Sequence, residues 1–197
     1  RTHPQTKNLL ELIYNDEIGK IYKIEASFGF KVKKVKKDSR LFNKDFGGGA
    51  ILDLGCYPIS FFNLFTDKNN KINFKSAEGT FCDTGVDDDA KIKLKIGNHI
   101  DAIGTVSLRK NLSNSCKIFG EKGNIVIPSP WLPANKSYIE VSNNKSYYKK
   151  FTTSEKSVYA TQIETIANLF TNKSLDIPSV VNINESIEIM KILDVWK

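Results

Sequence analysis

The fold and the candidate function of this chain depend on one stretch, Gly47-Gly48-Gly49-Ala50-Ile51-Leu52-Asp53-Leu54-Gly55-Cys56-Tyr57-Pro58-Ile59. Three glycines open it, and an apolar run of helical character follows. Glycine lets a backbone approach another group closely, because no side chain stands in the way. A helix that begins after these glycines would point its free N–H groups and the positive end of its dipole at the same place. That arrangement suits a developing negative charge.

An acid and a phenol follow the glycines at helical spacing. Asp53 and Tyr57 are four residues apart, so on a helix they share one face, one turn from each other. Such a pair can transfer protons. Cys56 and Ile59 fall on other faces and are expected to pack. The same spacing also occurs in helices where the acid is only solvated or capped, so the spacing alone leaves both interpretations open.

The glycine stretch resembles the signature helix of the Gfo/Idh/MocA oxidoreductases, the glucose-fructose oxidoreductase and inositol dehydrogenase superfamily. In that pattern a His or Tyr follows an acid by four residues. Asp53 and Tyr57 match the Tyr variant of its dihydrodiol dehydrogenase-like branch. Four further segments show a weaker resemblance, at Arg1–Gln5, Ile18–Ile21, Ser39–Phe42 and Phe119–Gly123.

The resemblance implies an α+β fold, in which a large, mostly antiparallel open-faced sheet has helices packed on one face. Hydrophobic periodicity in the chain is compatible with this fold. It predicts helices near 4–15, 49–65, 157–170 and 184–197. It also predicts strands near 20–32, 72–81, 86–96, 99–109, 114–119 and 123–127, and a hairpin over 137–150.

A nucleotide-binding domain is missing from this sequence. No G-x-G-x-x-G with an acid about 20 residues further on occurs, and neither does the Glu-Lys-Pro motif whose Lys is catalytic in the family. We therefore expect residues 1–197 to form one C-terminal substrate-binding and oligomerisation domain. The N-terminal Rossmann domain, its expected partner, would precede residue 1. The lack of an initiator Met agrees with this expectation of a C-terminal fragment, which alone would be inactive.

The resemblance implies that the parent is an NAD(P)-dependent dehydrogenase or reductase. Hydride would pass between the nicotinamide of NAD or NADP, bound mainly by the absent domain, and a sugar, polyol or related hydroxy/keto substrate. Tyr57 would exchange a proton with the substrate oxygen. Asp53 would orient the substrate hydroxyl or hold the Lys of the absent domain.

Other residues are expected at the margin of this site. Gly48, Gly49 and Arg1 are predicted beside the cofactor, and Arg40 and His3 near the substrate. A surface ion pair is the alternative for Arg40, and a polar residue of the first helical turn is the alternative for His3.

The formal charge of +7 comes from 29 Lys and Arg residues, of which only Arg1, Arg40 and Arg109 are Arg. Nucleic-acid readers rely on Arg forks, and no nucleic-acid module is recognisable, so we expect no nucleic-acid partner. The basic run 31–37 is typical of a solvated strand end or loop. Its alternative function is to attract an anionic cofactor phosphate or substrate. The acidic run 87–89 indicates the start of a strand, and no metal site is predicted.

The chain has three cysteines, an odd number, and no C-x-x-C motif. This favours reduced thiols in the cytoplasm. The sequence contains no apolar run of about 18 residues, so no membrane span is predicted.

A second function class stays open at this point. An open sheet face can pair with its own copy, which would make this chain a non-catalytic oligomerisation or binding module. A homodimer or higher homo-oligomer is expected through that face, and both roles can coexist in one protein.

Overall fold

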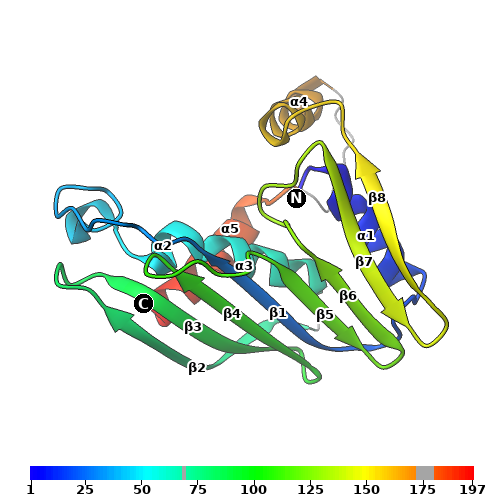
Figure 1. The fold of residues 1–197 in the computed structure, drawn as a ribbon, viewed down its shortest axis with the longest axis horizontal. Helices are drawn as coiled ribbons and strands as arrows, with labels where there is room; N and C mark the ends of the chain where they lie inside the picture. Colours follow the sequence, from blue (N-terminus) through cyan, green and yellow to red (C-terminus); the bar gives the residue numbers. More distant parts are fainter. Residues whose placement is uncertain (68–69, 172–179) are drawn as a thin grey trace. The chain divides into compact units, whose positions relative to one another are not determined.

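A computed structural model describes residues 1–67, 70–171 and 180–197. The chain forms two compact units, and each unit is built from two separate stretches. Unit 1 comprises residues 1–21 and 116–181, and unit 2 comprises residues 22–115 and 182–197. Figure 1 shows the strands and helices of both units.

Unit 2 holds the glycine stretch. It contains the helices α2 (Ala50–Leu54), α3 (Cys56–Phe62) and α5 (Ile183–Trp196), and the short 3-10 turns η1 (Lys44–Phe46) and η2 (Asn63–Phe65). Its strands are β2 (Ile72–Phe81), β3 (Asp87–Ile96), β4 (Ile100–Ser107) and nearly all of β1 (Ile21–Gly29), and they lie in the order β2-β3-β4-β1. β3 pairs antiparallel with both β2 and β4, whereas β1 runs parallel to β4.

Side chains alternate between the two faces of the unit 2 strands. Alternate residues of β3 and β4 are buried, namely Ala90, Ile92, Leu94, Ile96, Ile100, Ala102 and Val106. α2 packs on β3 and β4, and α5 packs on α2, α3 and β2. The intervening positions of β3 are Lys91, Lys93 and Lys95, none of which is buried. One face of β3 and β4 is therefore the apolar core, and the other is polar.

The signature helix is interrupted. The sequence predicts one helix over 49–65, but the structure divides it into α2, α3 and η2, with Gly55 between the first two. Proline has no N–H, so Pro58 cannot donate to the carbonyl of Leu54 and the helical ladder loses one bond there. The bonds on either side survive, from Gly55 to Ile51 and from Ile59 to Gly55. Gly55 keeps right-handed helical angles, so the backbone continues in the same direction.

Unit 1 contains α1 (Pro4–Tyr14) and α4 (Val158–Thr171). Its strands β5 (Cys116–Gly120), β6 (Gly123–Ile127), β7 (Lys136–Asn143) and β8 (Tyr147–Thr153) pair antiparallel in sequence order. α1 packs on β7 and β8 (Figure 1). The side chain of Asn143 shapes the β7–β8 turn, because its Oδ1 accepts from the N–H groups of Lys145 and Ser146. None of the residues of α4 is buried.

The predicted α+β class and the mostly antiparallel sheet are confirmed. The expected helices and strands are present, with ends that differ by a few residues. The strand expected over 20–32 ends at Gly29, beyond which the N–H groups of Phe30 and Val32 bond to the carbonyls of Ser107 and Leu108. The prediction of a single domain over 1–197 stays a prediction.

Packing of α5 against the signature helix gives a first test. Leu193 is fully buried and lies next to Gly55, so Leu193→Ala leaves a cavity in unit 2. We expect a loss of about 2–5 kcal/mol in the free energy of unfolding, measured by urea denaturation. Val195→Ala, on the exposed side of the same helix, is the control and should change it by less than about 0.5 kcal/mol. Equal effects of the two substitutions would contradict the assigned packing.

Candidate active site

Asp53, on the last turn of α2, is held by Arg40. The guanidinium Nη1 of Arg40 donates to Oδ1 of Asp53 at 2.5 Å. The carboxylate is mostly covered, with 15% of its side chain exposed, whereas 74% of the Arg40 side chain is exposed. The hydrogen bond and charge of Asp53 raise the pKa of Arg40, and Arg40 also interacts electrostatically with Tyr57. The structure therefore brings together three of the residues that the sequence predicts at this site.

Tyr57 lies in the first turn of α3, one turn after Asp53. Its ring packs edge-on against Phe28 of β1, with centroids 4.9 Å apart and planes at 86°. The residue is 38% exposed, so the phenol has a packed ring and access to solvent. Phe28 was not predicted at the site; in β1 it has the same parity as the buried Ile24 and Ala26. The ring contact limits the orientations that the phenol can take.

Two neighbours serve as packing residues, as expected. Ile59 is fully buried, and Cys56 is half-buried. Burial, followed by the charge of Asp53, raises the pKa of the Cys56 thiol. The thiol is therefore protonated at neutral pH and is a weak nucleophile.

The start of α2 differs from the expectation of free N–H groups. The carboxylate of Asp87, from the first residue of β3, accepts the N–H of Ile51 at 2.7 Å. Gly49, the residue before the helix, supplies no side chain of its own for capping. The expectation of a free helix start that faces a reacting anion is wrong, because an anion from the same chain already occupies it.

Gly48 and Gly49 are buried, so the predicted open backbone is not what the structure shows. A Cβ on Gly49 would lie 2.2 Å from Oδ1 of Asp87, and its φ of +120° is one that L side chains rarely adopt. A Cβ on Gly48 would lie within 3 Å of backbone atoms of Leu41 and Asn43. Packing within unit 2 thus explains both glycines, and their contact with a cofactor stays a prediction.

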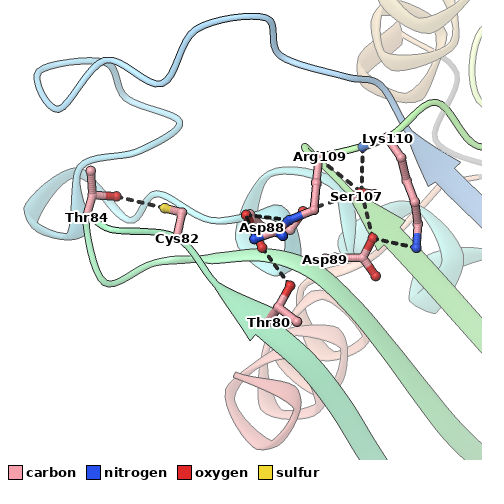
Figure 2. A network of polar contacts seen from close by, with 8 residues as sticks. All are labelled: Thr80, Cys82, Thr84, Asp88, Asp89, Ser107, Arg109 and Lys110. Carbon is pink, nitrogen blue, oxygen red and sulfur yellow. Dashed lines mark hydrogen bonds and ion pairs between the residues drawn. The ribbon is translucent and has the colours of Figure 1, made fainter.

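The acidic run was predicted as a strand start, and the structure agrees. One carboxylate oxygen of Asp88 accepts hydrogen bonds from Nε and Nη2 of Arg109. The other oxygen accepts a hydrogen bond from the hydroxyl of Thr80. Figure 2 shows the adjoining contacts, in which Asp89 bonds to Ser107 and Lys110. Each carboxylate of the run has its own partner. The described part of the chain contains no cluster of three metal-ligating side chains.

His3 and Arg1 belong to unit 1. Nδ1 of His3 accepts the N–H of Gln5 and so caps α1, and the imidazole is almost completely buried. Burial lowers the pKa of His3, so the ring is neutral at pH 7. This agrees with the alternative interpretation of His3 as a polar residue of the first helical turn. Substrate contact by His3 and cofactor contact by Arg1 stay predictions.

A small cavity of about 190 Å³ lies elsewhere in unit 2. It is lined by residues of α2, β2, β3 and the end of α5, among them Ile51, Asp87 and Trp196. Asp53 and Tyr57 do not line it. Among the described helices, none has the length and apolar character needed to cross a bilayer.

Comparison with known proteins identifies the family. The model of the GFO/IDH/MocA C-terminal domain matches residues 6–126, which is more than half of the chain. The chain belongs to this family. The resemblance noted for the glycine stretch is thereby confirmed.

Named relatives of the chain are oxidoreductases. It is 32% identical over 136 residues to trans-1,2-dihydrobenzene-1,2-diol dehydrogenase of Xenopus tropicalis, an alignment that covers 68% of this chain and 40% of that protein. The human protein of the same name is 29% identical over 136 residues, which cover 68% of this chain and 39% of that protein. The chain thus matches about two fifths of the length of these relatives.

Solved structures share the fold at lower identity. A 3-ketoreductase from Actinomadura kijaniata, crystallised with NADP and TDP-benzene, has a TM-score of 0.83 at 21% identity, covering 98% of this chain and 58% of that one. An aldose-aldose oxidoreductase from Caulobacter crescentus, complexed with glycerol, has a TM-score of 0.80 at 15% identity, covering 99% and 58%.

Gly49 provides a test of the packing around the start of α2. Gly49→Ala adds a methyl group against Asp87 in a backbone conformation disfavoured for alanine, so we expect a loss of about 3 kcal/mol or more in unfolding free energy. Gly85→Ala is the control, since Gly85 also has a positive φ but nothing within 4 Å of its added Cβ. The Gly85→Ala substitution should lower the free energy of unfolding by about 1–2 kcal/mol. A cost at Gly49 no greater than at Gly85 would contradict the contact with Asp87.

The environment of Asp87 predicts a pH dependence. Burial raises the pKa of this carboxyl above its ordinary value, although its backbone hydrogen bonds oppose the shift. A folded pKa above the unfolded one means that the stabilising contribution is complete below the unfolded pKa and is lost as pH rises through the folded pKa. Asp87→Asn keeps an acceptor for Ile51 but does not ionise. The unfolding free energy of wild type relative to Asp87→Asn should therefore fall with rising pH above about pH 4. A relative stability that rises over this range would contradict the assignment.

Proposed function

We propose that the parent protein is an NAD(P)-dependent oxidoreductase that transfers hydride between nicotinamide and a sugar, polyol or related hydroxy/keto substrate. In this proposal residues 1–197 supply the proton-transfer side of the site. The observation that carries it is the grouping of the Tyr57 phenol, the Asp53 carboxylate and the Arg40 guanidinium at the signature helix. Family membership supports it, as do relatives named dehydrogenase or reductase.

The described residues fit only part of what a nicotinamide cofactor needs. The buried glycines offer no open cradle, and the sequence has no dinucleotide-binding loop, so the cofactor would be held by a preceding Rossmann domain. When bound, the nicotinamide supplies or accepts the hydride. The phenol of Tyr57 and the carboxylate of Asp53 fit the accompanying proton transfer.

Tyr57 performs that proton transfer in our proposal. During reduction its hydroxyl donates a proton to the substrate oxygen as negative charge develops there, and during oxidation it takes the proton back. A free phenol has a pKa near ~10, so it needs a nearby cation to act efficiently at neutral pH. Arg40 is a cation that interacts with Tyr57 within this chain, and the Lys of a preceding domain would be a second. Phe28 limits the motion of the ring.

Asp53 orients the partners of Tyr57. Its ion pair with Arg40 fixes one carboxylate oxygen, and the other can accept a substrate hydroxyl or the ammonium of that Lys. The proposal therefore assigns acid–base chemistry to Tyr57 and positioning to Asp53.

Assembly through the open sheet face is the alternative function. In unit 2 this face carries ion pairs, between Lys23 and Glu25, Lys91 and Glu78, and Lys95 and Asp101. Charged residues are depleted at the centres of protein interfaces. These ion pairs therefore favour the enzyme over a module that exists only to pair with itself.

Tyr57→Phe in the full-length enzyme tests the proposal. It removes the transferable proton and keeps the ring contact with Phe28, so we expect kcat to fall by about a hundredfold or more with little change in cofactor affinity. Steady-state kinetics and a nicotinamide titration measure the two quantities. Tyr14→Phe, an exposed tyrosine on α1, is the matched control and should leave both unchanged. An unaltered kcat in Tyr57→Phe would remove Tyr57 from its role.

A further inference from the structure

The basic segment between β1 and the glycines is fixed at both ends. At its start, the N–H of Val32 donates to the carbonyl of Leu108 and the N–H of Lys31 to the side chain of Asn111. At its end Phe42 is buried, and the N–H of Gly49 donates to the carbonyl of Leu41. The remaining lysines and Arg40 lie between these anchors, and Arg40 contacts Asp53 of the candidate site.

Five lysines of this segment are exposed, namely Lys31, Lys33, Lys34, Lys36 and Lys37. Among the residues that the structure describes, no carboxylate forms an ion pair with any of them. The nearby cations of the 107–110 turn differ, because Asp88 neutralises Arg109 and Asp89 neutralises Lys110 (Figure 2). The five lysines therefore leave an excess of positive charge exposed to solvent, because Asp38 is the one carboxylate within residues 31–42 of the segment.

Arg40 has unused donors. Within the described residues, only Nη1 forms a hydrogen bond, to Asp53, and most of the side chain is exposed. The edge formed by Nε and Nη2 is open, and a guanidinium edge matches two oxygens of a phosphate group. One guanidinium can thus hold Asp53 and an anion at once.

We propose that Arg40 and these five lysines receive a phosphate group of the substrate, so that the substrate is a phosphorylated or nucleotide-linked sugar or polyol. This inference rests on the proposed function and names its substrate class. The lysines concentrate the anion near the site by long-range attraction. Arg40 binds it directly, next to Asp53 and Tyr57. Only binding and orientation are assigned to these residues.

Binding of a phosphorylated probe, measured without turnover, tests the inference. Glucose 6-phosphate and glucose are titrated into the full-length protein at low ionic strength by calorimetry. We expect the phosphorylated sugar to bind more tightly, and Arg40→Met to weaken its binding by roughly tenfold or more. Equal affinities for the two sugars, or unchanged binding in Arg40→Met, would overturn the inference.

A pair of triple variants separates local from overall charge. K33A/K34A/K36A removes three of the five lysines, and K75A/K117A/K145A removes three exposed lysines from other elements. The first should weaken glucose 6-phosphate binding severalfold and flatten its salt dependence, and the second should change neither. Equal losses of glucose 6-phosphate affinity in both triple variants would mean that only the net charge of the protein matters, and would overturn the inference.

Cofactor titrations distinguish a phosphate of the substrate from the phosphate of NADP. Titration of NADP and NAD into Arg40→Met should give wild-type affinities if the phosphate belongs to the substrate. Selective loss of NADP binding would assign the phosphate to the cofactor and overturn the substrate class. Tyr57→Phe should bind glucose 6-phosphate normally even though it turns over slowly, so failure of the proton-transfer role and failure of the phosphate site give different results.

Discussion

The candidate site depends on one buried contact, between the carboxylate of Asp87 and the first turn of α2. The contact joins the first residue of β3 to the helix that carries Asp53, and Gly49 makes room for it because it has no side chain. An anion at a helix start satisfies a free N–H and interacts favourably with the helix dipole. Since α2 has only five residues, it has little stability of its own and needs such an external partner. The contact thus fixes the helix on which Asp53 and, one turn later, Tyr57 are placed.

The same contact changes how the glycines are understood. Glycine before a helix is often associated with a bound ligand, because the backbone is accessible there. In this chain the space beside Gly49 is filled by Asp87, and the space beside Gly48 is filled by the backbone of 41–43. The polar side chains of the candidate site lie instead on the side of Asp53, Tyr57 and Arg40. Arg40 connects this side to the basic segment that precedes the glycines.

Local patterns predicted much of the architecture and the spacing of the central pair of the candidate site. The helices, strands and turns followed from periodicity and turn residues, and a spacing of four placed Asp53 and Tyr57 one turn apart. The partners of these elements could not be predicted in the same way. Asp87 is 38 residues from Gly49 in the chain, and nothing in an acidic triplet indicates that its first member caps a distant helix. The contact of Phe28 with Tyr57 and the choice of Asp53 as partner of Arg40 likewise depend on tertiary packing.

The parallel pairing of β1 with β4 has a consequence for how unit 2 folds. Lys23 lies opposite Asp101, so β1 must wait for a partner that lies far along the chain. Unit 2 also includes α5, which is formed by the second of its two stretches, residues 182–197. Closing such long loops costs chain entropy before any contact repays it, so assembly is slow compared with that of hairpins. On the ribosome, β5–β8 can pair as they emerge, whereas unit 2 is completed only after α5 has been synthesised. Until then the apolar surfaces of α2, α3 and β2 that α5 covers are available to chaperones or to aggregation.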